Sequence, residues 1–364
     1  MRILAIDVGT GTQDVLLFDP EREIENCVQL VLPSPTAIVA DKIREATRQG
    51  NRVVLTGRQM GGGPSSWAAR DHALAGLPIA ATSGAATTFD DDLDRVREMG
   101  VQIVSDDEAA GLPGTAIRLG DVDRDGLLAV LGRFDVPPPD AWAVAVFDHG
   151  AAPPGVSDRA FRFDYLATRI DGGLAALAFP ADETPPEMTR LAAAAESVPS
   201  PALVMDTGPA AVLGALDDPA VARPGIVANL GNFHTLAFLL DEDGIAGLFE
   251  HHTGELTAPQ LEGFLRRLAD GTLTNAEIFG SQGHGAIVRR AGDTGLALSG
   301  PRRTLLVGSA LRPRFAVPHG AMMVAGCFGL LRAWAALDPA VREQVERRLG
   351  PPPAVLAQAS GLAR

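Results

Sequence analysis

Short apolar runs separated by turns open the chain. Residues 2–8 are mostly apolar, residues 9–12 contain two glycines, and residues 13–18 form a second apolar run. Two such runs around a glycine turn predict a β-hairpin. A third run at residues 27–32 ends at prolines, and helical periodicity follows over residues 36–49. The N-terminal part is therefore expected to form three strands and a helix.

Strands and helices then alternate as far as the middle of the chain. The pattern predicts strands at residues 52–55, 78–82, 101–104 and 141–147, and helices at residues 65–75 and 91–99. Such alternation is typical of a mainly parallel sheet covered by helices.

The second half repeats the opening order of elements. It predicts strands at residues 225–230, 235–240 and 244–249, a helix at 258–268, a late strand at 304–307 and a closing helix at 320–337. Two strand–turn–strand units, each followed by a strand and a helix, indicate an internal duplication. We therefore expect two domains, residues 1–200 and 201–364.

Composition and charge narrow the class of protein. The 364 residues are 46% hydrophobic and 21% charged, which is ordinary for a globular chain. Asp7 and Asp14 interrupt the apolar N-terminal segment, so we expect neither a signal peptide nor a membrane helix, and a cytoplasmic protein. The net charge of −14 argues against a nucleic-acid partner. A homo-oligomer is compatible with the sequence.

The cysteines and lysines exclude two kinds of site. Cys27 and Cys327 are the two cysteines of the chain, and an iron–sulfur cluster of the radical-enzyme kind needs three in a C-x3-C-x2-C motif. Lys42 is the one lysine, so a P-loop with its phosphate-binding lysine is also excluded.

The first hairpin carries a candidate phosphate site. Gly9 and Gly11 let backbone N–H groups approach an anion, and Thr10 and Thr12 add hydroxyl donors. Asp7 can hold Mg²⁺ through water. The alternative is an ordinary glycine hairpin that binds no ligand.

Four motifs in order resemble those of actin-like ATPases such as sugar kinases and hydantoinases. They are IDVGTGT at residues 6–12, LVMDTGP at 203–209, ANLGNFHT at 228–235 and LLVGSA at 305–310. The resemblance implies an α/β, two-lobed actin-like ATPase (ribonuclease H-like) fold with duplicated mixed sheets. It also implies ATP and Mg²⁺ between the lobes, with phosphate contacts from Asn229, Gly231 and Asn232 and adenosine contacts from Gly308 and Ser309.

The wording of the chain is also similar to an uncharacterised prokaryotic family whose members are labelled pyruvate formate-lyase activating enzymes. The similar stretches are LPSP at residues 32–35, VMDTGP at 204–209, FEHHTG at 249–254 and GCFG at 326–329. Because the three-cysteine motif is missing, we do not expect a radical S-adenosylmethionine activase.

The second hairpin departs from the hydantoinase-like pattern. Asn229 and Leu236 stand where that pattern has aspartates, and Asn232 and Phe233 stand where Gly and Thr are expected. A missing carboxylate weakens magnesium binding, which leaves ATP turnover open.

Asp206 and Asp148 are the candidate catalytic carboxylates. Asp206 lies between an apolar strand and a helix start, where it can activate a nucleophile or cap the helix. Asp148 at the end of another strand is the second candidate. Arg58 in a glycine-rich loop and His149 are the candidate substrate contacts, and a plain glycine linker is the alternative interpretation of that loop.

Loop histidines suggest a divalent metal site as an alternative. His234, His251 and His284 can converge with Glu250 or Asp148. His251 and His252 are adjacent and cannot both face one site from a strand. Scattered surface histidines are the other interpretation.

Two functions are compatible with these residues. One is an ATP-dependent phosphotransferase or ATP-driven hydrolase, a kinase-like or hydantoinase-like enzyme that acts on an unidentified small molecule. The other is a catalytically weakened regulatory protein of the same fold that binds a nucleotide or metabolite.

Overall fold

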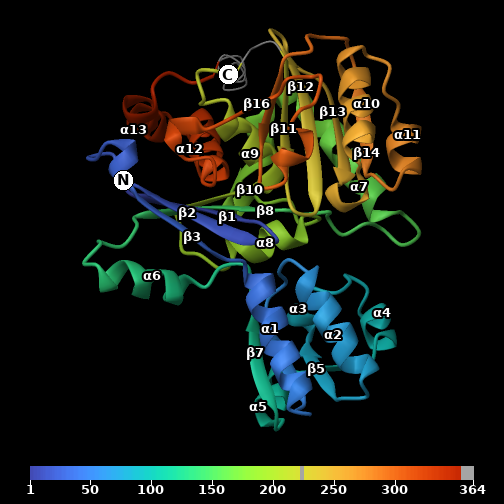
Figure 1. Cartoon of the computed structure of the whole chain (residues 1–364). Coiled ribbons are helices and arrows are strands. Elements are labelled where there is room, and N and C mark those ends of the chain that lie inside the picture. The colour runs from blue at the N-terminus through green and yellow to red at the C-terminus, as the bar shows by residue number, and fades with distance from the viewer. Residues whose placement is uncertain (222–224, 354–364) are drawn as a thin grey trace.

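The protein is a mixed α/β molecule built on three sheets, and the computed structural model describes residues 1–221 and 225–353 (Figure 1). The first sheet has the order β3-β2-β1-β8-β10-β9. Its strands are β1 (Ile3–Val8), β2 (Thr12–Phe18), β3 (Val28–Pro33), β8 (Ala141–Val146), β9 (Ala178–Pro180) and β10 (Ala202–Asp206).

The second sheet has the order β14-β13-β12-β11-β15-β16. Its strands are β11 (Gly225–Leu230), β12 (His234–Asp241), β13 (Gly244–His252), β14 (Gly285–Val288), β15 (Leu296–Ser299) and β16 (Arg314–Phe315). Strands β11, β12 and β13 match the three strands expected at residues 225–230, 235–240 and 244–249.

The two large sheets share their central pairing. In the first, β1 pairs antiparallel with β2, β2 pairs antiparallel with β3, and β1 pairs parallel with β8. In the second, β11, β12 and β13 repeat the antiparallel pairs, and β11 pairs parallel with β15. Each hairpin turn therefore leaves its sheet at the same edge, the carboxyl end of the first strand.

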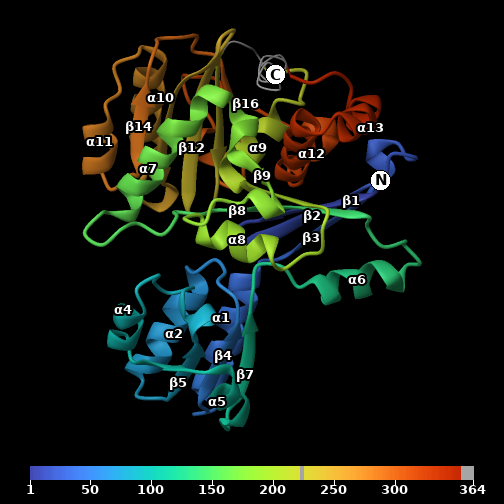
Figure 2. The same ribbon diagram turned by 180° about the vertical axis from the view of Figure 1, so that it is seen from behind.

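A small parallel sheet is inserted into the first half of the chain. It has the order β6-β5-β4-β7 and comprises β4 (Val53–Gly57), β5 (Ile79–Thr82), β6 (Val101–Val104) and β7 (Thr115–Leu119). Its helices are α1 (Pro35–Arg48), α2 (Pro64–Leu74), α3 (Ser83–Ala86), α4 (Leu93–Glu98) and α5 (Asp106–Gly111). This inserted unit stands apart from the two large sheets, as Figure 2 shows from behind. The expected βα alternation is present, but it builds this separate sheet.

The other helices pack on the large sheets or on one another. They are α6 (Arg124–Arg133), α7 (Asp158–Arg169), α8 (Thr189–Ala195), α9 (Thr207–Ala215), α10 (Ala258–Ala269), α11 (Asn275–Gly280), α12 (Ala325–Leu337) and α13 (Pro339–Leu349). Helix α13, for example, packs against α12. None of the helices in residues 1–221 and 225–353 has the length and apolarity to cross a bilayer.

Helices α9 and α12 cross at very short range in the main core. A Cβ on Gly214 would lie 1.7 Å from the carbonyl oxygen of Ala325, and one on Gly329 would lie 1.8 Å from that of Ala210. Glycine at both positions lets the backbones touch, and α12 also packs on β1 and β8.

Two predicted elements are wrong or misplaced. Residues 303–306 form a 3-10 helix where a strand at 304–307 was expected, and β15 is the late strand that pairs with β11. The closing helix begins at Ala325, since His319 and Gly320 have φ values of 46° and 76° that interrupt a helix. Strand β10 of the first sheet lies beyond residue 200, and the division at that residue stays a prediction.

Candidate functional site

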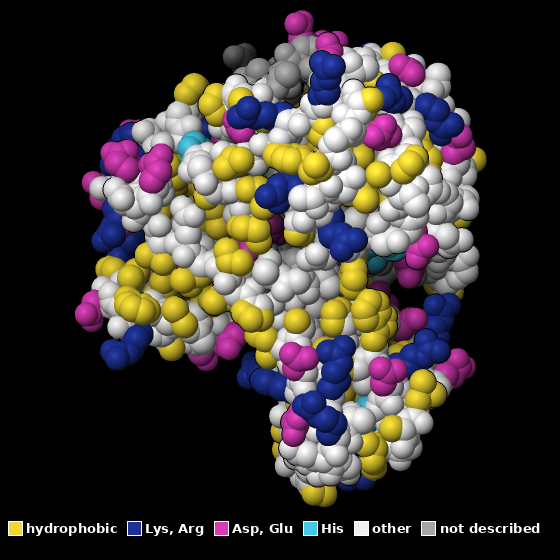
Figure 3. Space-filling view, in the orientation of Figure 1, with side chains coloured by type: hydrophobic (Ala, Val, Ile, Leu, Met, Phe, Trp, Pro, Cys, Tyr) yellow, Lys and Arg dark blue, Asp and Glu magenta, His cyan; other side chains and the backbone are white. Residues whose placement is uncertain are grey.

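A cavity of about 880 Å³ lies where the two large sheets meet the inserted unit. Gly9 and Thr10 line it from the first hairpin turn, and Gly231 and Asn232 line it from the second. In the space-filling view a hollow separates the inserted unit from the body above it, and histidine side chains show at its upper rim (Figure 3). The cavity is therefore shared by both hairpins.

The two turns are built alike. Gly9 N–H donates to the carbonyl of Thr12 at 2.9 Å, and Gly231 N–H donates to that of His234 at 2.9 Å. These two amides are thus used by the turns themselves. A Cβ on Gly11 would lie 2.4 Å from Asn232 Nδ2, so the tips of the turns are in contact.

The inserted unit closes over the second turn. A Cβ on Gly63 would lie 2.7 Å from the ring of Phe233, and the Trp67 ring is centred 5.3 Å from the same ring. Gly61 packs against the guanidinium of Arg190, which is also paired with Asp121.

Asp7 lies behind the first turn, against the starts of α9 and α12. Thr207 Oγ1 donates to its Oδ1, and a Cβ on Gly326 would lie 2.0 Å from its Oδ2. Burial raises the pKa of Asp7 to about 7, against the opposing effect of the Thr207 hydrogen bond. Asp7, Gly11 and Thr12 are not among the described residues that line the cavity, and magnesium binding by Asp7 stays a prediction.

The two candidate catalytic carboxylates bind the backbone. Asp206 caps α9 by accepting from Gly208 N–H at 3.0 Å, and its other oxygen accepts from Arg162 Nη1 at 2.6 Å. Asp148 accepts from Gly150 N–H at 2.8 Å and from Leu191 N–H at 2.9 Å. The helix cap that competed with catalysis for Asp206 is therefore present.

Three other predicted contacts lie away from the cavity. Arg58 pairs with Glu196 on the surface. Gly308 and Ser309 follow the 3-10 helix, where Ser309 N–H donates to Leu306. Of the residues that the structure describes, none of these three lines the cavity.

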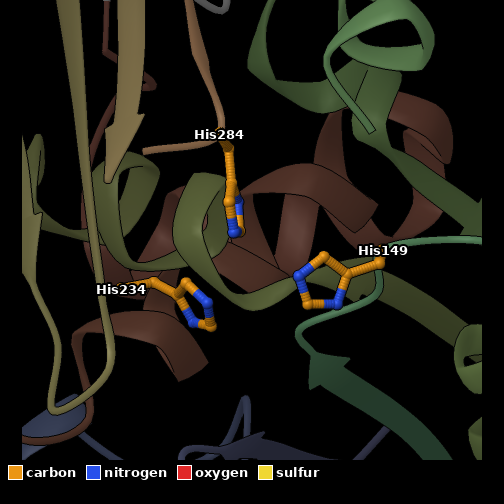
Figure 4. A group of neighbouring side chains, drawn as sticks. All are labelled: His149, His234 and His284. Atoms are coloured by element: carbon orange, nitrogen blue, oxygen red, sulfur yellow. The ribbon is translucent and has the colours of Figure 1, made fainter. Parts of the chain in front are cut away.

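His149, His234 and His284 converge beside the cavity (Figure 4), which His149 and His234 line. One nitrogen of each ring lies within 4.8 Å of the others. His149 follows β8, His234 begins β12, and His284 precedes β14. The rings of His149 and His234 are each centred 5.0 Å from the ring of His284. From the sequence we predicted that His234 and His284 belong to a metal site and that His149 contacts the substrate.

His251 does not join this group. Its Nδ1 lies 3.0 Å from the carbonyl oxygen of His252, and its Nε2 lies 3.1 Å from Ser281 Oγ. The alternation of side chains along β13 sends Glu250 and His252 to the face opposite His251.

A buried ion pair orients His284. Its Nδ1 bonds to Glu250 Oε1, and Arg162 donates from Nε and Nη2 to the same carboxylate at 3.0 Å and 2.8 Å. Although burial favours the neutral acid, Arg162 and His284 hold the pKa of Glu250 well below its usual range. Glu250 is therefore a carboxylate that accepts a hydrogen bond from His284 Nδ1–H.

Phe147 organises the other two rings. It stacks on His234 with a centroid distance of 3.9 Å and meets His149 edge-on at 4.8 Å. The guanidinium of Arg162 also packs over the Phe147 ring, 4.0 Å from the ring centre. Burial lowers the pKa of His149 to about 3 and that of His234 well below its usual range, so both rings are neutral at physiological pH.

Sequence reasoning did not identify Arg162 or Phe147. Arg162 lies on α7, a helix that the apolar pattern did not lead us to predict. Its apolar neighbours at helical spacing, Phe163 and Leu166, are both buried and were the available signal.

The sequence model of one family matches residues 60–305 of the chain, and it is described as "Putative pyruvate format-lyase activating enzyme (DUF1786)". The chain belongs to this family. The match covers most of the chain and includes all three converging histidines.

Comparisons with other proteins add little to this membership. No curated protein matches the chain. Among solved structures, the crystal structure of an exopolyphosphatase-like protein is similar at 10% identity and a TM-score of 0.29, over 97% of this chain and 92% of that one. A likeness this weak supports no conclusion about fold or function.

The residues of this family member do not fit the iron–sulfur cluster that an activating enzyme of the radical kind would hold. Such a cluster needs three thiolates, and the chain has two cysteines. Both are buried, and Cys327 Sγ lies against the backbone of Ala5 and Asp14.

Proposed function

We propose that the protein is an enzyme of the actin-like ATPase fold that binds a nucleoside triphosphate in the cavity and transfers or hydrolyses its terminal phosphate. The observation that carries this proposal is that the hairpin turns of both large sheets line one cavity. The co-substrate would be a small molecule.

The repeated sheet order supports the fold part of the proposal. In each large sheet an antiparallel three-strand unit is extended by parallel strands, β8 and β10 in one and β15 and β16 in the other. This is the order that a duplicated ribonuclease H-like lobe requires. The turns then face each other because both sheets present the same edge.

The charges of the cavity require a cation with the phosphates. Carboxylates line it, including Asp90, Asp91 and Asp92 from the inserted unit. A polyphosphate would be repelled by these groups unless a divalent ion lies between them. Asp91 would hold Mg²⁺ through water, because it lines the cavity whereas Asp7 does not. The ion would neutralise charge on the phosphates.

Two polar side chains at the turns would contact the phosphates. Thr10 offers a hydroxyl from the first turn, and Asn232 offers an amide from the second. Both are donors, which suits phosphate oxygens.

A second function is favoured by the state of the two carboxylates. Asp206 and Asp148 each accept hydrogen bonds at both oxygens, so both carboxylates have structural roles in the fold. A nucleotide-binding regulatory protein with weak or absent turnover fits this observation.

Thermal unfolding of the full chain with Mg-ATP, Mg-ADP or inorganic phosphate tests the proposal. A ligand at 100 times its Kd stabilises the protein by about 2.7 kcal/mol, so Mg-ATP should raise the Tm. Thr10→Ala and Asn232→Ala should both reduce this rise, while exposed Thr168→Ala, remote from the cavity, should not. No change in Tm with any nucleotide would refute nucleotide binding.

Phosphate release separates the two functions. The enzyme should release phosphate from ATP, and Thr10→Ala should slow it. A rise in Tm without phosphate release would favour the regulatory protein.

A further inference from the structure

We propose that His149, His234 and His284 bind one divalent transition-metal ion of the zinc type, with an open coordination position facing the cavity. The proposal goes beyond nucleotide binding, since none of the three histidines belongs to the phosphate contacts described above. It rests on the arrangement of the rings and on their surroundings.

The first support is a ring nitrogen without a partner. His284 is fully buried, its Nδ1 is bonded to Glu250, and its Nε2 has no hydrogen-bond partner among the described residues. A buried polar atom left unpaired costs about 1–3 kcal/mol. Since Nδ1 is bonded to Glu250, Nε2 is the ring nitrogen left to bind a metal ion, and one nitrogen of His284 lies within 4.8 Å of one nitrogen on each of the other two rings.

The second argument is that a carboxylate already holds the His284 ring. Histidine ligands of metals commonly donate their remaining N–H to a carboxylate, which fixes the ring orientation and raises its basicity. Glu250 supplies this carboxylate, and Arg162 holds it with hydrogen bonds from Nε and Nη2. The carboxylate is therefore in place before any ion binds.

The third argument is that contacts with Phe147 fix the positions of the His149 and His234 rings. Phe147 stacks flat against His234 and meets His149 edge-on. His149 and His234 line the cavity as well. A metal held by the three rings would thus have its fourth position open to water or to a ligand oxygen, as catalytic zinc sites with three protein ligands do.

The ligand set selects the class of ion. Imidazole nitrogen suits Zn²⁺, Co²⁺, Ni²⁺ and Cu²⁺, whereas Mg²⁺ and Ca²⁺ prefer oxygen. Tetrahedral zinc with Zn–N bonds of about 2.1 Å places its ligand nitrogens about 3.4 Å apart. The nitrogens here lie within 4.8 Å of one another, so small side-chain rotations suffice to close the site.

Metal titration of the chelator-treated full chain tests the site. Calorimetry with ZnCl₂ should show one tightly bound equivalent, and CoCl₂ should give the intense visible absorption of four-coordinate cobalt. If folded wild-type protein binds neither zinc nor cobalt at micromolar concentrations, the proposal is overturned.

Substitutions locate the ion on the three rings. His149→Ala and His234→Ala should each lower zinc affinity about 100-fold or more and abolish the cobalt spectrum. His251→Ala and His319→Ala, which remove histidines outside the group, should bind as wild type does. Circular dichroism in chelator verifies that each variant is folded, and His149, which lies in a loop, is the substitution least disruptive to the strands.

Glu250→Gln tests the role of the carboxylate that is bonded to His284 Nδ1. It should lower zinc affinity by about 10–100-fold while keeping one equivalent bound. Zinc binding that is the same in wild type, His149→Ala and His234→Ala would show that the ion lies elsewhere and would refute the site. Because zinc is added without nucleotide, failure here leaves the Mg-ATP experiment unaffected, and the reverse also holds.

Discussion

The buried guanidinium of Arg162 has three polar partners. It pairs with Glu250 from the second sheet and Asp206 from the first, and it donates to the carbonyl of Asp148. A buried charge is tolerated only when its partners compensate it. One side chain therefore ties Asp206 and Glu250 together, and by holding Glu250 it also orients the His284 ring.

Replacing Arg162 should destabilise the fold strongly. Arg162→Met leaves Glu250 and Asp206 buried without their cation, which should lower the free energy of unfolding by about 3–5 kcal/mol. Urea denaturation measures this. The matched control is Arg58→Met, whose pair with Glu196 is exposed and should contribute about 1 kcal/mol or less. Equal losses in the two variants would contradict this account.

Asp14 should make stability depend on pH. Its Oδ1 has no partner among the residues described, and burial, followed by repulsion from Asp7, raises its pKa to about 8. The folded protein therefore keeps a proton that the unfolded chain releases near its ordinary pKa of 3.8. Stability from this group is fully present below that value and is lost as pH rises toward about 8.

Asp14→Asn should remove this part of the pH dependence. Urea denaturation at pH 5 and pH 8 should show the variant gaining about 2–4 kcal/mol over wild type between the two conditions. The same difference between variant and wild type at both pH values would show that Asp14 titrates normally.

The residues of the candidate site were predicted in part. Glycine, aspartate and histidine next to turns can be recognised one by one, and they singled out all three converging histidines. The sequence could not show that His149 belongs with His234 and His284, because His149 follows β8 of the first sheet whereas the other two adjoin strands of the second. Nor could it show which face of β13 His251 occupies. Contacts between segments far apart in the chain are set by the tertiary fold.

At the scale of elements, the crossing of α9 and α12 depends on two glycines. Gly214 and Gly329 leave no space for a side chain, because backbone carbonyls lie where a Cβ would be. Backbone atoms cannot move aside as a flexible side chain can. The spacing of these two helices is therefore fixed by residue size.

Gly329→Ala should force the helices apart. The added methyl would lie 1.8 Å from the carbonyl oxygen of Ala210, so we expect a loss of about 1–3 kcal/mol or more in unfolding free energy. Gly263→Ala in α10 is the matched control, because its Cβ meets nothing within 4 Å. That change should stabilise by about 0.5–1 kcal/mol through helix propensity. A stabilising Gly329→Ala would contradict the close crossing.

Elements were predicted well where the pattern was strong. The opening hairpin and the three strands of the second unit lie where apolar runs and glycine turns placed them. The strand expected at residues 304–307 failed because a short apolar run fits a strand or a helical turn equally. Pairing with other strands decides between them, and in this fold it is β15 that pairs with β11.

At the scale of the whole molecule, the sequence indicated the duplication but not the third sheet. Alternating strands and helices predict a parallel sheet, yet they do not say which sheet a strand joins. Strands β4 to β7 pair among themselves, and β8 returns to β1. The inserted unit is therefore a product of long-range pairing, which local periodicity does not encode.

The three histidines come from different sheets. His149 follows β8 of the first sheet, whereas His234 and His284 adjoin β12 and β14 of the second. An ion that grips all three would act as a clasp between the halves, and its affinity would vary with their separation. By thermodynamic reciprocity, any molecule that draws the halves together tightens the hold on the ion, and any that wedges them apart helps to release it.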